Sequence, residues 1–172
     1  MATKDRRFDR RVCLVSGSGV VLSSLLDATS AIATPSPELL VVVHPSNSIR
    51  LSVEELASIF KTTMRYWSGS KRIVALNLPP RSPERVTFDR VVLGMDPDAS
   101  FRFWIDRKIR GGEPAPRNVP DPDVVLGIVQ RTEAAIGYAP SHLVKDGVRV
   151  IARIRGNSAE NVAVSGVQGA HP

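Results

Sequence analysis

Three residues at the start of one predicted helix, Arg81, Ser82 and Arg85, have the chemistry to hold an anion. Ser82 is a good N-cap residue, and Pro83 suits the first helical position because its missing N–H would be unpaired there in any case. Such a helix start directs free backbone N–H groups and the positive end of the helix dipole to one spot. Guanidinium groups can bind an oxyanion through two parallel hydrogen bonds. We therefore predict an oxyanion pocket here; the alternative is an ordinary strand-to-helix turn with solvated arginines.

Residues that could perform catalysis or hold a metal do not form a recognisable set. The histidines, His44, His142 and His171, lie far apart without metal-ligand spacing. No serine or cysteine lies in a nucleophile-elbow motif, and no glycine-rich nucleotide loop occurs. We therefore expect no catalytic residue, no metal site, no cofactor and no enzymatic activity.

The predicted pocket lies between a strand within residues 71–78 and a helix that Gly94 ends. An earlier apolar run, residues 39–43, has the continuous pattern of a strand buried on both faces. This run leads into a polar turn with Ser46 and Asn47, which we include among the candidate ligand-binding residues. Two later apolar segments are also predicted as strands: residues 135–139 and 148–154.

Further helices are predicted from their start signals and apolar spacing. One begins at the capping box Ser52–Glu55, and we expect Phe60 and Trp67 on its apolar face to lie in the core. Two others begin at Asp96 and Asp121, each an acidic N-cap followed by proline. The helix from Asp96 is expected to bury the following stripe: Phe101, Trp104, Ile105 and Ile109. The order β-α-β-α-α-α-β-β predicts an α/β fold with a small mixed sheet covered by helices.

The N-terminal residues have the order of a secretory signal peptide. A basic head over residues 1–11 precedes a short apolar run over 12–26, and Ala31-Ile32-Ala33 fits a small-x-small cleavage signature. We therefore expect cleavage after Ala33 and a periplasmic or otherwise extracytoplasmic protein, exported by the general or the twin-arginine route. An N-terminal helix or an exposed extension is the alternative. The expected organisation is as follows: signal peptide 1–33, folded domain 34–155 and flexible tail 156–172.

Cysteine and charge content limit the chemistry and the partners. The single cysteine, Cys13, lies within the expected signal peptide, so the mature chain would have no disulfide. A formal net charge of +6 favours anionic ligands or surfaces. Because no block of like charge occurs, we expect no nucleic-acid partner. An unprocessed cytoplasmic protein that binds nucleic acid is the corresponding alternative.

Several segments, taken in order, resemble the substrate-binding proteins of bacterial phosphate ABC transporters, which have the type 2 periplasmic binding protein fold. They are VVVHPSNSI, LSVEELASIF, RIVALN, GMDPDASFRFWIDRKIRGG and AAIGYAP, within residues 39–154. The resemblance implies a solute-binding protein for inorganic phosphate or a related oxyanion in ABC-type uptake. The candidate ligand-binding residues are Arg81, Ser82, Arg85, Ser46 and Asn47.

Two departures from the family pattern bear on this function. The family's serine- and glycine-rich phosphate loop is replaced here by residues 79–85, in which Glu84 would repel an anion if it pointed inward. Family members have two lobes that close on the ligand, whereas this chain resembles one lobe, which cannot enclose phosphate by itself. An ABC transporter permease or a second binding lobe would have to supply the other wall. The alternative function is a ligand-free interaction module that docks on an envelope or membrane partner.

Overall fold

The computed structural model describes residues 38–68 and 70–161, apart from the Asn161 side chain. The expected signal peptide, residues 1–33, and most of the expected tail lie outside these residues, so both remain predictions there. Within the described part of the chain, no helix has the length and apolar character needed to span a membrane.

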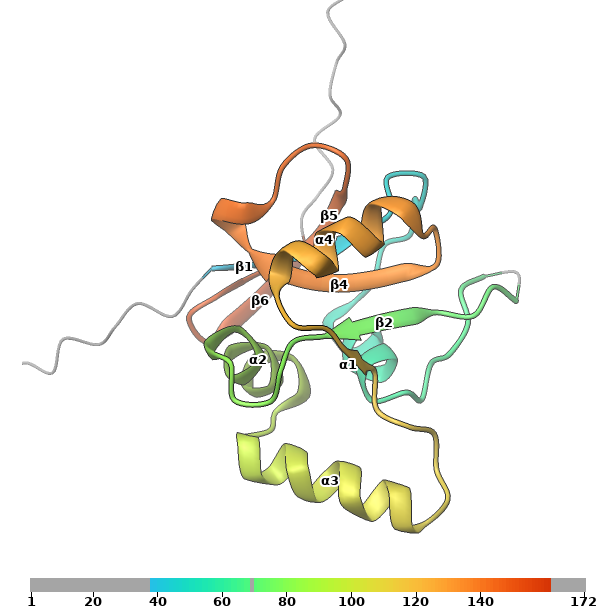
Figure 1. Ribbon diagram of the computed structural model, residues 1–172, viewed down its shortest axis with the longest axis vertical. Coiled ribbons are helices and arrows are strands. Elements are labelled where there is room, and N and C mark those ends of the chain that lie inside the picture. Colours follow the sequence, from blue (N-terminus) through green and yellow to red (C-terminus); the bar gives the residue numbers. More distant parts are fainter. Residues whose placement is uncertain (1–37, 69, 162–172) are drawn as a thin grey trace, which may run out of the picture. The chain divides into compact units, whose positions relative to one another are not determined.

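A mixed β-sheet organises the described residues (Figure 1). Its strands are β1 (Leu39–Val43), β2 (Val74–Asn77), β3 (Arg117–Asn118), β4 (Ala135–Pro140), β5 (Arg149–Arg155) and β6 (Ser158–Asn161). Their order across the sheet is β3-β2-β4-β1-β5-β6. Strand β2 is parallel to β3 and β4, whereas β1 is antiparallel to β4 and β5, and β6 is antiparallel to β5. This arrangement confirms the predicted α/β class with a small mixed sheet.

Each helix begins where its N-cap residue predicts. The α-helices are α1 (Val53–Phe60), α2 (Pro83–Phe88), α3 (Pro97–Ile109) and α4 (Pro122–Arg131), and a π-helical turn (Asp89–Leu93) extends α2. A side-chain oxygen of each N-cap accepts a hydrogen bond from the backbone N–H three residues later, at 2.7–3.2 Å: Ser52, Ser82, Asp96 and Asp121. Short 3₁₀ structure over Ser141–Leu143 follows β4. Local capping therefore places these helices along the chain.

The core lies between the sheet and its covering helices, and its centre is aromatic. Strand β1 is buried along its whole length, as its continuous apolar pattern predicts. The Phe88 ring stacks on Tyr138 with 4.0 Å between centroids, and Phe60 lies 4.5 Å from Phe88. Trp67 is also buried, and its Nε1–H donates to the Ala134 carbonyl at 3.1 Å. The predicted core positions of Phe60 and Trp67 are confirmed.

The predicted buried stripe of α3 is wrong. Phe101 is 67% exposed, Ile105 44% and Ile109 80%, and Trp104 is only half-buried. The helix turns its other side inward, where the buried Ser100 hydroxyl donates to the Asp89 carboxylate at 2.9 Å. This hydrogen bond thus determines which face of α3 is covered, and the apolar row on the other face is exposed.

The predicted start of the flexible tail is also wrong. Residues 158–161 form β6, which pairs with β5 after a turn in which Gly156 has a φ of 55°. The backbone pairing with β5 orders this segment although its sequence has little apolar character. Strand β3 is a short strand between α3 and α4 that pairs in parallel with β2.

Close packing of β4 against α4 can be tested at Gly137. A Cβ atom at this position would lie 2.4 Å from Val125 Cγ1, so we expect Gly137→Ala to lower the free energy of unfolding by about 1–3 kcal/mol through overpacking. Gly127 on α4 is the matched control, because its added Cβ meets only the end of the Arg131 side chain. Gly127→Ala should retain or raise stability by up to about 1 kcal/mol. Urea unfolding measures both, and an unchanged Gly137→Ala midpoint would contradict this packing.

Candidate functional site

The site is built on a buried ion pair within the helix that follows β2. Arg85 and Asp89 are one helical turn apart, and Arg85 Nε donates to Asp89 Oδ1 at 2.7 Å. Both side chains are more than nine-tenths buried. Arg85 Nη1 also donates to the Leu78 carbonyl at 3.3 Å, and the second Asp89 oxygen accepts from Ser100. The pair therefore joins the end of β2 to α2 and α3.

Asn77, the last residue of β2, extends this network to β4. With its amide oxygen directed at Arg85, it accepts from Nη1 at 2.8 Å and from Nη2 at 3.2 Å. Its amide nitrogen then donates to the Tyr138 hydroxyl at 2.7 Å, and the Leu78 N–H donates to the same hydroxyl at 3.4 Å. Burial raises the pKa of the Tyr138 phenol well above its ordinary value. Tyr138 is thus held neutral.

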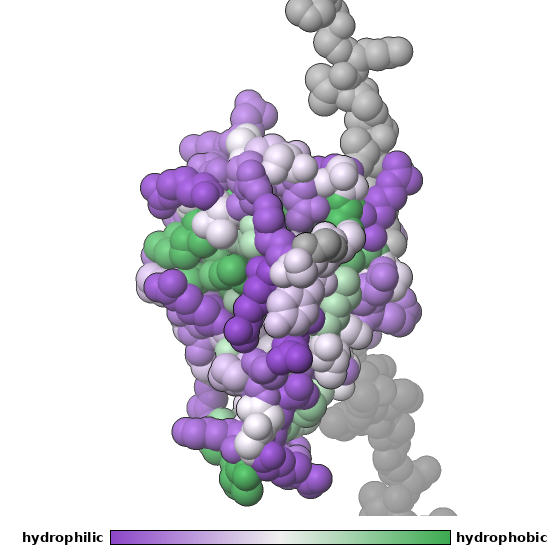
Figure 2. Space-filling view, turned by 90° about the vertical axis from the view of Figure 1, so that its right-hand side faces the viewer, coloured by the Kyte–Doolittle hydropathy of each residue, from purple (hydrophilic) through white to green (hydrophobic). Residues whose placement is uncertain are grey.

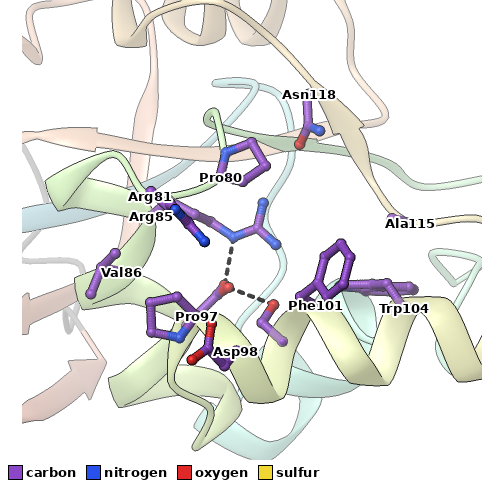
Figure 3. Close-up of a pocket in the computed structure, with 12 residues that line it drawn as sticks. Pro80, Arg81, Arg85, Val86, Pro97, Asp98, Phe101, Trp104, Ala115 and Asn118 are labelled. Atoms are coloured by element: carbon purple, nitrogen blue, oxygen red, sulfur yellow. Dashed lines mark hydrogen bonds and ion pairs between the residues drawn. The ribbon is translucent and has the colours of Figure 1, made fainter.

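A pocket of about 430 Å³ opens beside this network (Figure 3). Figure 3 shows the Arg85 guanidinium directed into it, with Pro80 and Asn118 on one side and Phe101 and Trp104 on the other. The complete lining is as follows: Pro80, Arg81, Arg85, Val86, Asp89, Pro97, Asp98, Ser100, Phe101, Trp104, Ala115 and Asn118. The pocket lies beyond the carboxyl ends of the parallel strands β2 and β3, which is the usual ligand position in α/β sheets.

The charges around the pocket are mixed. Arg81 is exposed and has a φ of 73°, an uncommon backbone conformation for a residue other than glycine. The exposed Asp98 carboxylate also borders the pocket, and Asp89 neutralises Arg85 within its wall. Any anion would therefore be attracted chiefly by Arg81, because the Arg85 Nη groups already donate to Asn77 and to the Leu78 carbonyl.

The predicted ligand-binding residues are divided between two places. Arg81 and Arg85 line the pocket, and Ser82 caps α2 with its hydroxyl bonded to the Arg85 N–H. Ser46 and Asn47 instead line a separate depression, where Ser46 Oγ lies 2.7 Å from His44 Nδ1 and the Ile49 N–H donates to the Asn47 side chain.

Strand direction separates the two groups. The last residue of β1, Val43, pairs with Ile136 at the start of β4, and the first residue of β2, Val74, pairs with Ala135 beside it. The turn after β1 therefore lies at the end of the sheet opposite to the pocket, which follows the carboxyl end of β2. Ser46 and Asn47 cannot share one small ligand with Arg81.

Sequence reasoning missed the polar partners of Arg85. Asp89 follows Arg85 at the i, i+4 spacing that brings side chains together on a helix, so this contact could have been predicted from the sequence. Asn77, Ser100 and Asn118 reach the site from other elements, and only the folded chain brings them to it.

Comparisons with known proteins identify the fold. No family model and no curated protein matches the sequence. Among solved structures, the chain is similar to an ABC-type phosphate transport receptor from Vibrio cholerae (17% identity, TM-score 0.53) and to a phosphate ABC transporter substrate-binding protein with bound phosphate from Clostridium perfringens (18%, 0.53). It is also similar to PstS from Borrelia burgdorferi (16%, 0.51).

The chain shares the fold of these substrate-binding proteins. The matches cover 67%, 67% and 68% of this chain but only 46%, 45% and 48% of the respective neighbours. The described domain therefore corresponds in fold to part of each neighbour, which is consistent with the single-lobe interpretation. At these identities the likeness establishes the fold alone.

Burial of Tyr138 should make stability fall in alkali. The phenol of the unfolded chain loses its proton near pH 10, whereas the raised pKa keeps folded Tyr138 protonated. Its contribution to stability is therefore complete below about pH 10 and is lost as the pH rises further, by up to about 1.4 kcal/mol per pH unit. Urea unfolding between about pH 9 and pH 11 (roughly one unit to either side of the unfolded pKa) measures this slope. Tyr138→Phe should flatten it, whereas Tyr66→Phe at an exposed site should not.

The two pocket arginines should differ in their effect on stability. Arg85→Ala would leave the Asp89 carboxylate buried without its partner, so we expect a loss of about 3–5 kcal/mol in the free energy of unfolding. Arg81→Ala, at an exposed position of the same pocket, should change it by less than about 1 kcal/mol. Equal stabilities of the two variants in urea would contradict the structural role of Arg85.

Proposed function

We propose that this protein is a single-lobe solute-binding protein that holds phosphate or a related oxyanion beside α2, as part of ABC-type uptake. The observation that carries the proposal is the Arg85 guanidinium, which Asp89 and Asn77 fix in the wall of a pocket that Arg81 also lines. A cation held in place before the ligand arrives loses little conformational freedom on binding. The shared fold with phosphate-binding proteins supports the ligand class.

The roles of the predicted residues change in this proposal. Arg81 is the principal anion-binding residue, because it is exposed at the pocket and no internal partner neutralises it in the described structure. Arg85 contributes chiefly its charge, because its Nη groups already donate to Asn77 and to the Leu78 carbonyl, and Asn118 can donate from the opposite wall. Ser82 acts by capping α2, since its hydroxyl already accepts the Arg85 N–H. Ser46 and Asn47 are excluded from this site by their position at the other end of the sheet.

The pocket is open, so a second wall is part of the proposal. We assign that wall to an ABC transporter permease or a second binding lobe, because a half-site cannot remove water from around an oxyanion. Export after cleavage behind Ala33 would bring the domain to the compartment in which such transporters collect their substrates. Residues 1–33 carry five basic and three acidic residues, so their removal would leave a formal net charge of +4, which favours the approach of an anion.

One observation favours a second candidate function, docking on an envelope or membrane partner without a ligand. The Asp98 carboxylate at the pocket opposes an anion, and the apolar row on α3 is exposed. In this alternative the pocket accommodates part of the partner in place of a small solute.

Calorimetric titration at low salt separates the two functions. We expect the purified protein to bind phosphate or sulfate with a dissociation constant of roughly millimolar to micromolar, weakening as salt is added. Arg81→Ala should reduce the affinity by about tenfold or more, the loss of one charge-assisted contact. Arg131→Ala is the matched control, because Arg131 is exposed on α4 and does not line the pocket.

Two outcomes of this titration would contradict the proposal. Absence of heat with phosphate, sulfate and small carboxylates would favour the docking function. Equal affinities of Arg81→Ala and Arg131→Ala for the anion would show that the anion does not bind in this pocket.

A further inference from the structure

Helix α3 presents an apolar row to solvent. Phe101, Ile105 and Ile109 follow one another at intervals of four residues, so they share one side of the helix. They are the exposed large hydrophobic side chains of this helix, at 67%, 44% and 80% exposure. Figure 2 shows hydrophobic surface at the lower end of the molecule, at the height of α3, bordered by hydrophilic residues. An exposed apolar row with a polar border is typical of a surface that binds another molecule.

A row of charges runs beside the apolar row and alternates in sign. It consists of exposed residues at the same interval of four: Asp98, Arg102, Asp106 and Arg110. Arg110 already holds Asp106 within the helix at 2.9 Å, and both side chains remain more than half exposed. The row therefore reads negative, positive, negative, positive from the start of the helix to its end.

We infer that this face of α3 binds the same face of α3 in a second copy of the chain, with the two helices antiparallel. A two-fold axis near Ile105 brings each flank of the helix against itself in reverse order. Arg102 then meets Asp106 of the second copy, and Asp98 meets Arg110 of the second copy. Phe101 meets Ile109 of the second copy. Each contact occurs twice.

The charge order excludes the other simple arrangement. In a parallel, in-register pair, the charged row of each helix would lie against the other flank of the partner helix, which carries Trp104 and Lys108, so it would meet no complementary row. The antiparallel pair brings the charged row against itself in reverse order and makes the contacts complementary. The row is self-complementary when the two-fold axis is perpendicular to the helices, and for this reason the occupant is a second copy rather than an unrelated apolar partner.

The dimer would be weak and dependent on concentration. A helix of 13 residues is about 20 Å long, so one helix pair buries less than the roughly 1,200–2,000 Å² of a standard stable interface. Phe101 and Asp98 also line the pocket, so the second copy would lie at its rim. The inference does not depend on the proposed anion, because it rests on α3 alone.

Sedimentation of the purified full chain over a range of concentrations tests this dimer. We expect the mean mass to rise from 18.7 kDa towards twice that value. Ile109→Asp should weaken association by roughly tenfold or more, because it places a carboxylate in the apolar contact. Val124→Asp is the matched control, an exposed apolar residue on α4 that should leave association unchanged.

Charge exchange tests the antiparallel order. Arg102→Glu and Asp106→Arg should each weaken the dimer, and the double variant should recover most of the loss. Circular dichroism confirms that α3 stays helical in each variant, because residues 102 and 106 also face each other within one helix.

Several outcomes would overturn the inference. The wild-type chain could remain monomeric at all concentrations, or Ile109→Asp could associate as tightly as wild type. A monomeric wild type that Ile109→Asp destabilises would show instead that a segment of the same chain, such as the apolar residues 12–26, covers the face. A double variant that is no tighter than the single variants would overturn the antiparallel pairing.

Discussion

The ion pair between Arg85 and Asp89 is the interaction on which the arrangement of the other elements depends. A charge removed from water needs a partner and further hydrogen bonds, and each of the elements around the pair supplies one. Strand β2 gives the Asn77 amide, the residue after it gives the Leu78 carbonyl, and α3 gives the Ser100 hydroxyl. If either charge were lost, the other would remain buried at the junction of these elements. The pair therefore fixes the direction in which the chain leaves β2.

The same interaction sets the chemistry of the pocket. Because Arg85 directs its Nε–H to Asp89 and its Nη groups to Asn77 and the Leu78 carbonyl, the positive charge that it presents to the cavity is already balanced in part. A guanidinium that is already paired within the fold is well positioned to contact an anion but attracts it only weakly. The strength of anion binding then depends on Arg81, which contributes less to the fold. Arg85 thus mainly stabilises the fold, whereas the attraction of an anion depends mainly on Arg81.

Local signals predicted much of the fold and only part of the site. The caps Ser52, Ser82, Asp96 and Asp121 act within one helical turn, so the sequence alone locates the helix starts. The placement of Ser46 and Asn47 depends on the antiparallel pairing of β1 with β4, which no local pattern determines. For α3, periodicity shows that Phe101, Ile105 and Ile109 share a side. It cannot show that Ser100, on the other side, is the anchor.

The open pocket and the exposed face of α3 meet at one residue, Phe101, which belongs to both. The matches to the solved structures cover slightly less than half of the length of each neighbour. A second copy on α3 would bring protein surface to the rim and lower the water content around a bound anion, which strengthens charge contacts. Such coupling is reciprocal: an anion that binds the dimer more tightly than the monomer must also favour the dimer. In that case assembly would provide part of the enclosure that the open pocket lacks.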